Sequence, residues 1–165
     1  MIITHASQDK ITKVINEDFL CDCRMGCLFF GGEGNTYNLA ADCNYQYNLD
    51  VENVLEMRHL NYKHNFEECE IMKDVFADMR IKFNFTENVT DEELAELLDE
   101  TLSIDDFENV FVRREEWGMG QWVLQQFQGI IAHKLGYDCA EAEDEQGTVY
   151  IAYCVGRELT EIKCC

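Results

Sequence analysis

The spacing of apolar residues changes twice along this chain, and this change restricts the fold more than any other feature. Residues 45–51 alternate apolar and polar side chains with the two-residue period of a strand. Residues 66–135 carry apolar side chains at the three- and four-residue steps of helices, and a continuous apolar run returns at 149–155. The sequence therefore predicts a mixed α+β fold, and its 165 residues suit a single domain with one core.

The N-terminal third reads as short strands broken by loops. We expect strands near 1–4, 19–23, 26–30 and 45–51, and a short helix around 11–15, where Ile11, Val14 and Ile15 recur at helical spacing.

The rest of the chain reads as three amphipathic helices and a hairpin. The second helix begins at a capping-box sequence, in which Thr90 and Glu93 can each bond the other's backbone N–H. Gly136 supplies a C-terminal stop for the third helix. We expect helices over 66–79, from Thr90 onward and over 117–135, and two strands within 137–155 joined by a tight acidic turn.

The charge of the chain restricts its partners. Thirty-three acidic and 13 basic side chains give a formal charge of −20, which repels a phosphate backbone and makes direct nucleic-acid binding unfavourable. The same field favours encounter with basic protein surfaces, including surfaces that hold DNA or RNA. No apolar stretch approaches the ~20 residues of a membrane helix, and the N-terminus does not resemble a signal peptide. We therefore expect a soluble, cytoplasmic protein without a membrane partner.

Nine cysteines cannot all pair internally, which favours a reducing compartment. Cys21, Cys23 and Cys27 form a cluster that suggests zinc, but no C-x-x-C pair or second cluster accompanies it. We expect buried thiols in strands and no metal site.

The D-E-Q-G-T turn at 144–148 is the strongest candidate for chemistry. Carboxylates at the start of a strand can point into a cleft, and Gly147 permits the tight turn of the backbone before that strand. Taken alone, such a turn is also typical of a solvated hairpin. A Rossmann nucleotide site is excluded, because the glycines at 31–34 do not complete its G-x-G-x-x-G pattern.

The order of these features resembles the small phage-encoded ADP-ribosyltransferase-like anti-CRISPR proteins that inactivate type I-F surveillance complexes. That group has an H-x-S segment after the first strand, here His5 to Ser7. It also has a G-[FY]-x6-D-E-Q-G-T pattern that carries the catalytic acid, here Gly136 and Tyr137 followed by the 144–148 turn at nearly that spacing. The chain departs from the group in its many cysteines and in a helical insertion at about 57–110.

The resemblance implies an ADP-ribosyltransferase-like split antiparallel sheet with flanking helices over 1–165, and NAD as co-substrate. Cleavage develops positive charge on the ribose C1′, which a nearby carboxylate stabilises. The resemblance makes Asp144 the essential acid with Glu145 second, and neighbours on a strand face opposite ways, so the sequence leaves the choice open. His5 is expected to hydrogen-bond the ribose hydroxyls as a neutral or protonated donor. The further cofactor-binding candidates are Ser7, Phe29, Tyr37, Tyr47 and Thr148, with Arg24 as the nearest base for the pyrophosphate.

The resemblance also implies a target. The expected function is mono-ADP-ribosylation of a host protein, a DNA-recognising subunit of a CRISPR-Cas surveillance complex, in the host cytoplasm. The alternative is a non-catalytic acidic decoy that occupies a basic nucleic-acid-binding surface. A third possibility is a toxin or metabolic enzyme that uses NAD on another target.

Overall fold

The computed structural model describes residues 1–16, 25–33, 43–83, 85, 88–107, 120–144 and 147–162. Its strands form two sheets, one of three strands in the order β1-β3-β7 and one of four in the order β2-β6-β5-β4. The strands are β1 (Ile2–Ser7), β2 (Cys27–Phe30), β3 (Tyr45–Asp50), β4 (Val54–Glu56), β5 (Cys139–Asp144), β6 (Gly147–Tyr153) and β7 (Thr160–Ile162). All pairs are antiparallel except β4 with β5.

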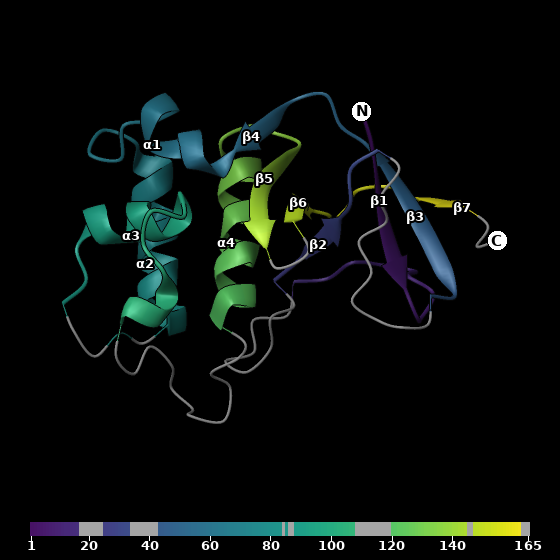
Figure 1. Ribbon diagram of the computed structural model, residues 1–165, viewed down its shortest axis with the longest axis horizontal. Helices are drawn as coiled ribbons and strands as arrows, with labels where there is room; N and C mark the ends of the chain where they lie inside the picture. Colours follow the sequence, from purple (N-terminus) through teal and green to yellow (C-terminus); the bar gives the residue numbers. More distant parts are fainter. Residues whose placement is uncertain are drawn as a thin grey trace.

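The helices lie on one side of the four-stranded sheet (Figure 1). The α4 helix lies against that sheet, α2 and α3 lie beyond α4, and the β1-β3-β7 sheet is farthest from the helices. The bounds are α1 (Leu60–Lys63), α2 (Glu70–Phe83), α3 (Asp91–Leu98) and α4 (Gly120–Lys134), with short 3-10 turns at Met57–His59 and Ile104–Asp106. This arrangement confirms the predicted α+β class.

Two cores fill the spaces between these layers. The larger core lies between the helices and the four-stranded sheet, and the smaller one joins the two sheets around Ile3, Phe30 and Leu49. Gly129 brings α4 very close to the sheet, since a Cβ there would lie 2.7 Å from the Cys27 sulfur and 2.8 Å from Ile151 Cγ2. A glycine at this point of the helix therefore allows the close approach.

Several local predictions are confirmed. The 147–153 strand follows the acidic turn, α4 ends before Gly136, which has φ +88°, and α2 buries Met72, Val75, Phe76 and Met79. The α2 helix begins at Glu70, so Phe66 and Cys69 pack against the core from the segment before it. The helices at 57–106 occupy the segment predicted as an insertion, and its status relative to the family stays a prediction.

Two local predictions are wrong. Residues 11–15 form no helix. The Ile11 N–H donates to the Tyr47 hydroxyl at 2.8 Å, and the backbone of Asn16 forms an isolated β-bridge with that of Met25. These tertiary bonds override a weak helical signal in a β-branched segment. His5 and Ser7 do not follow the first strand but lie within it, because β1 pairs with β3 as far as Ser7. The predicted strand at 19–23 lies outside the described residues.

The capping box at the start of α3 is present as predicted. Thr90 Oγ1 accepts from the Glu93 N–H at 3.2 Å, and Glu93 Oε2 accepts from the Thr90 N–H at 2.8 Å. The Thr90 N–H and the Thr90 hydroxyl each donate to Glu93 Oε2 at 2.8 Å, and these two bonds hold the pKa of Glu93 below its ordinary value.

We expect Thr90→Ala to lower the free energy of unfolding by about 1 kcal/mol, because the first turn of α3 loses its side-chain acceptor. Urea unfolding under reducing conditions measures this, with Thr101→Ala, at an exposed position after the helix, as the control. A carboxylate with a lowered pKa contributes stability above its unfolded pKa and loses it as pH falls. The difference between wild type and Thr90→Ala should therefore shrink below pH 4.5, and a difference that grows there would contradict this account.

Candidate functional site

A cavity of about 430 Å³ opens where β1 separates from the edge of β2. Among the described residues, the backbones of the two strands form one β-bridge, in which Thr4 and Gly31 exchange hydrogen bonds of 3.0 and 2.9 Å. Beyond that bridge the cavity is bounded by β1, by Gly26 to Phe29 of the β2 edge, by α4 and by the 9–15 segment. Three of the predicted site residues, His5, Ser7 and Phe29, line it.

The side chain of His5, in β1, extends to the edge of β2. Its Nδ1 lies 2.7 Å from the Phe29 carbonyl oxygen, which can only accept, so Nδ1 carries the proton and donates. Burial lowers the pKa of His5, although the bond to Phe29 acts in the opposite direction. The imidazole is therefore neutral near pH 7 and its Nε2 is an acceptor. His5 suits a hydroxyl that donates to it, which refines the expected donor role.

This geometry makes the stability of the fold depend on pH through His5. A histidine whose pKa is lowered on folding binds its proton better when unfolded, so stability falls as pH drops below 6.5. His5→Asn keeps an N–H near the Nδ1 position but does not titrate. We expect the stability advantage of wild type over His5→Asn to decrease between pH 7.5 and pH 5 in urea unfolding. An advantage that increases on acidification would show that the imidazolium is the favoured form.

The aromatic residues near the site are mostly buried, and the predicted role of Phe29 and Tyr47 in binding the cofactor stays a prediction. Phe29 is only 6% exposed, and its ring contacts Trp122 at a centroid distance of 5.6 Å, so Phe29 belongs mainly to the core. Trp122, at the start of α4, is half-buried and lines the cavity. Sequence reasoning did not single out Trp122, because the helical pattern does not show which face of α4 meets β2.

Tyr47 is not among the residues that line this cavity, although its hydroxyl contacts one of them, Ile11. It is 2% exposed, and its hydroxyl accepts from the Ile11 N–H, which ties the 9–15 segment over the three-stranded sheet. Directly paired residues of a sheet share a face, so His5, Tyr47 and Glu161 lie in a row across β1, β3 and β7. Glu161 forms a 2.8 Å ion pair with Lys10 of the cavity lining. No sequence signal linked these two residues, 151 positions apart, to one site.

The 144–148 turn lies elsewhere in the described structure. Asp144 ends β5 and pairs with Gly147, so β2 and β6 stand between it and β1, three strand spacings of about 4.8 Å each. Among the described residues, neither Asp144 nor Thr148 lines the His5 cavity. The Thr148 hydroxyl donates to Glu143 at 3.0 Å.

The Ser7 hydroxyl forms a local hydrogen bond, in which it donates to the Asp9 carbonyl oxygen at 2.7 Å. Glu145, Tyr37 and Arg24 lie outside the described residues.

Comparison with known proteins decides the family. The sequence model of the family described as anti-CRISPR type I-F ADP-ribosyltransferase AcrIF11 matches residues 1–161. The chain belongs to the AcrIF11 family. A solved structure described as an anti-CRISPR protein shares the fold, with a TM-score of 0.60 and 21% identity over 98% of this chain and 95% of that one. The comparison with curated proteins returned no match.

Membership of the AcrIF11 family identifies the chain as a type I-F anti-CRISPR protein of the ADP-ribosyltransferase class. In the described part of this AcrIF11-family chain, no helix is long and apolar enough to cross a membrane.

Three of the five cysteines that the structure describes in this AcrIF11-family protein are core residues, and the other two, Cys43 and Cys69, are half-buried. Cys27 and Cys139 are buried in β2 and β5, and Cys154 is buried just after β6. Burial raises the pKa of Cys139 and of Cys154 to about 12, so these thiols stay protonated at neutral pH. Within the residues that the structure describes, no group of three or more metal-ligating side chains comes together.

Proposed function

We propose that this chain transfers ADP-ribose from NAD to a host protein, a DNA-recognising subunit of a type I-F CRISPR-Cas surveillance complex. The observation that carries the proposal is the cavity beside β1, where a neutral His5 meets aromatic and basic side chains. Its volume of about 430 Å³ is within the range of small-molecule sites. The residues present fit a dinucleotide: an acceptor for hydroxyls, an aromatic surface at Trp122 and the cations Lys10 and Lys13.

We assign each of these residues a share in binding NAD. His5 Nε2 accepts from a ribose hydroxyl, while its Nδ1–H bond to Phe29 holds the ring in one tautomer. Trp122 stacks on a planar ring, as aromatic side chains commonly do. Lys10 and Lys13 are close enough to the cavity to attract the pyrophosphate.

NAD supplies the electrophile: the bond between nicotinamide and the ribose C1′ breaks, and its electron pair leaves with nicotinamide. The acceptor side chain of the target forms the new bond to C1′ and gives its proton to a carboxylate. A carboxylate also stabilises the positive charge that develops on C1′. We assign this role to Asp144, with Glu145 second, on the strength of the D-E-Q-G-T motif. Because Asp144 does not line the His5 cavity, this assignment requires the bound NAD to extend from that cavity across the sheet toward the end of β5. Glu161 is a third carboxylate to test, since it shares the sheet face of His5.

The test is incubation of the purified surveillance complex with a small fraction of an equivalent of this protein, with and without NAD. We expect loss of DNA binding only with NAD, persistence after the inhibitor is removed, and one subunit that gains the mass of ADP-ribose.

The acidic decoy predicts a different pattern. It would need at least one copy per target, would not require NAD, and would weaken as salt screens the acidic surface. The variant Glu92→Gln removes one negative charge from the exposed surface of α3, so it is a control for the contribution of the acidic surface. It should leave NAD-dependent labelling unchanged. Inhibition that is stoichiometric, independent of NAD and reversible would overturn the catalytic proposal.

A further inference from the structure

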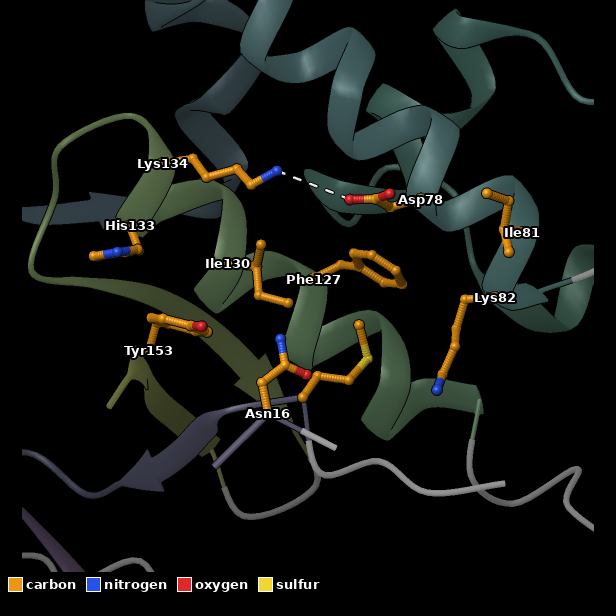
Figure 2. Close-up of a pocket in the computed structure, with 10 residues that line it drawn as sticks. Asn16, Asp78, Ile81, Lys82, Phe127, Ile130, His133, Lys134 and Tyr153 are labelled. Atoms are coloured by element: carbon orange, nitrogen blue, oxygen red, sulfur yellow. Dashed lines mark ion pairs between the residues drawn. The ribbon is translucent and has the colours of Figure 1, made fainter. Parts of the chain in front are cut away.

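The α4 helix contributes side chains to two different cavities. The larger cavity, of about 760 Å³, lies between α2 and α4, and Figure 2 shows Phe127 at its centre. There the Lys134 ammonium faces the Asp78 carboxylate at 3.8 Å. The residue before Phe127, Gln126, lines the His5 cavity instead, because successive residues of a helix point about 100° apart. Gln126 is therefore a polar side chain of the His5 cavity to which the proposed reaction assigns no role.

Side chains take the place of a neighbouring strand along the open edge of β2. Alternate residues of a strand direct their backbone groups to the same edge. Beyond the bridge to β1, the Phe29 carbonyl oxygen accepts from His5, and the Cys27 N–H donates to Gln126 Oε1 at 3.1 Å. One of these side chains comes from β1 and the other from α4. Both are thus held by the backbone of β2 at the wall of the cavity.

The bond to Cys27 fixes the orientation of the Gln126 amide. A backbone N–H can only donate, so the atom that meets it is the carbonyl oxygen Oε1, and the NH2 group is turned away from Cys27. Gln126 is only 3% exposed and lines the cavity, and none of the described residues accepts a hydrogen bond from its NH2 group. A buried donor without a partner is costly, and an acceptor on a ligand offsets that cost.

His5 and Gln126 therefore give the cavity complementary polar groups, an acceptor at His5 Nε2 and a donor at the Gln126 amide. Their contacts with β2 lie two residues apart, about 7 Å along an antiparallel strand. Trp122 lies four residues before Gln126 on α4, so these two side chains share one face of the helix, and both line the cavity. A flat ring that lies on Trp122 has its edge toward Gln126.

We propose that the His5 cavity holds the adenosine half of NAD, and that Gln126 recognises the base. The adenine ring lies on Trp122, a ring nitrogen accepts from the Gln126 NH2 group, and a ribose hydroxyl donates to His5. This inference rests on the proposed function, in which the reacting C1′ belongs to the nicotinamide end and lies near Asp144. Because Asp144 does not line this cavity, the nicotinamide end lies outside it and the adenosine end inside.

The test uses AMP as the probe, titrated into the full chain under reducing conditions and followed by amide chemical shifts in NMR. We expect saturable binding with a Kd of about 1 mM or tighter, with shifts in β1, β2 and α4. Nicotinamide mononucleotide, the other half of NAD, should bind at least about tenfold more weakly. Trp122→Ala should weaken AMP binding at least about fivefold, because the base loses its stacking surface.

Variants of two neighbouring glutamines isolate the donor. Gln126→Met has a similar length and no N–H group, and we expect it to weaken AMP binding about three- to tenfold, the effect of one hydrogen bond. Gln125→Met is the matched control, since Gln125 is also 3% exposed but does not line the cavity. It should change the affinity less than about twofold. If Gln126→Met does not fold, Gln126→Glu keeps an oxygen for the Cys27 N–H, and at pH 8 it should cause at least the same loss.

The inference and the proposed function fail in different ways. The inference is overturned by absence of saturable AMP binding below about 10 mM, by equal AMP affinity in the Gln126 and Gln125 variants, or by tighter binding of nicotinamide mononucleotide than of AMP. Each of these results can occur in a protein that transfers ADP-ribose. AMP binding that depends on Gln126, in a protein that transfers nothing from NAD, would support the adenosine subsite and overturn the proposed reaction.

Discussion

Replacing Asp144 by asparagine should lower the rate of ADP-ribosyl transfer by roughly 10²–10⁴-fold while the protein stays folded. Asparagine has nearly the same shape as aspartate and can still accept a hydrogen bond, but it has no negative charge. The charge acts mainly on the transition state, in which C1′ becomes positive, so NAD affinity should change little. Labelling of the surveillance complex with labelled NAD gives the rate, and circular dichroism checks the fold.

The controls distinguish the candidate carboxylates. Asp74→Asn makes the same chemical change at an exposed position of α2 and should leave transfer unchanged. Glu145→Gln tests the second acid of the motif. Glu161→Gln removes the charge that faces Lys10 on the His5 sheet, and we expect a smaller loss than for Asp144→Asn. Full activity in Asp144→Asn together with loss in Glu161→Gln would move the essential acid from the β5–β6 turn to β7.

Replacing Phe76 by alanine should destabilise the protein by about 3–5 kcal/mol. Phe76 is fully buried on the face of α2 that meets the larger core, with Met72 and Met79 beside it. Removing a buried ring loses its transfer free energy and leaves a cavity that a packed interior closes only in part.

Ile81→Ala on the same helix is the matched control for the Phe76 variant, because Ile81 is 73% exposed. It should change the free energy of unfolding by no more than about 0.5 kcal/mol. Urea unfolding of the reduced proteins measures both, and equal losses in the two variants would show that α2 does not pack through the face described here.

Local signals were sufficient for much of the fold. The capping box at Thr90, the stop at Gly136 and the hairpin after Asp144 each depend on residues close together in the chain, and each formed where predicted. The 11–15 segment did not form its helix, since its backbone bonds the Tyr47 hydroxyl, and a single sequence does not show that tertiary partner.

The candidate site was predicted less completely than the fold. His5, Ser7 and Phe29 do line one cavity, and the motif at 144–148 led to the correct family. Trp122, Lys10 and Glu161 were missed, because each enters the site through contacts between distant elements.

The sequence by itself determined the element types, the acidic surface and the family, because periodicity, composition and motif spacing are properties of the chain. Only the tertiary structure decided where β1 leaves β2 and which nitrogen of His5 carries the proton. It also revealed a cavity between α2 and α4. These features arise from strand register and helix packing, which bring side chains together across sequence distances that no local pattern spans.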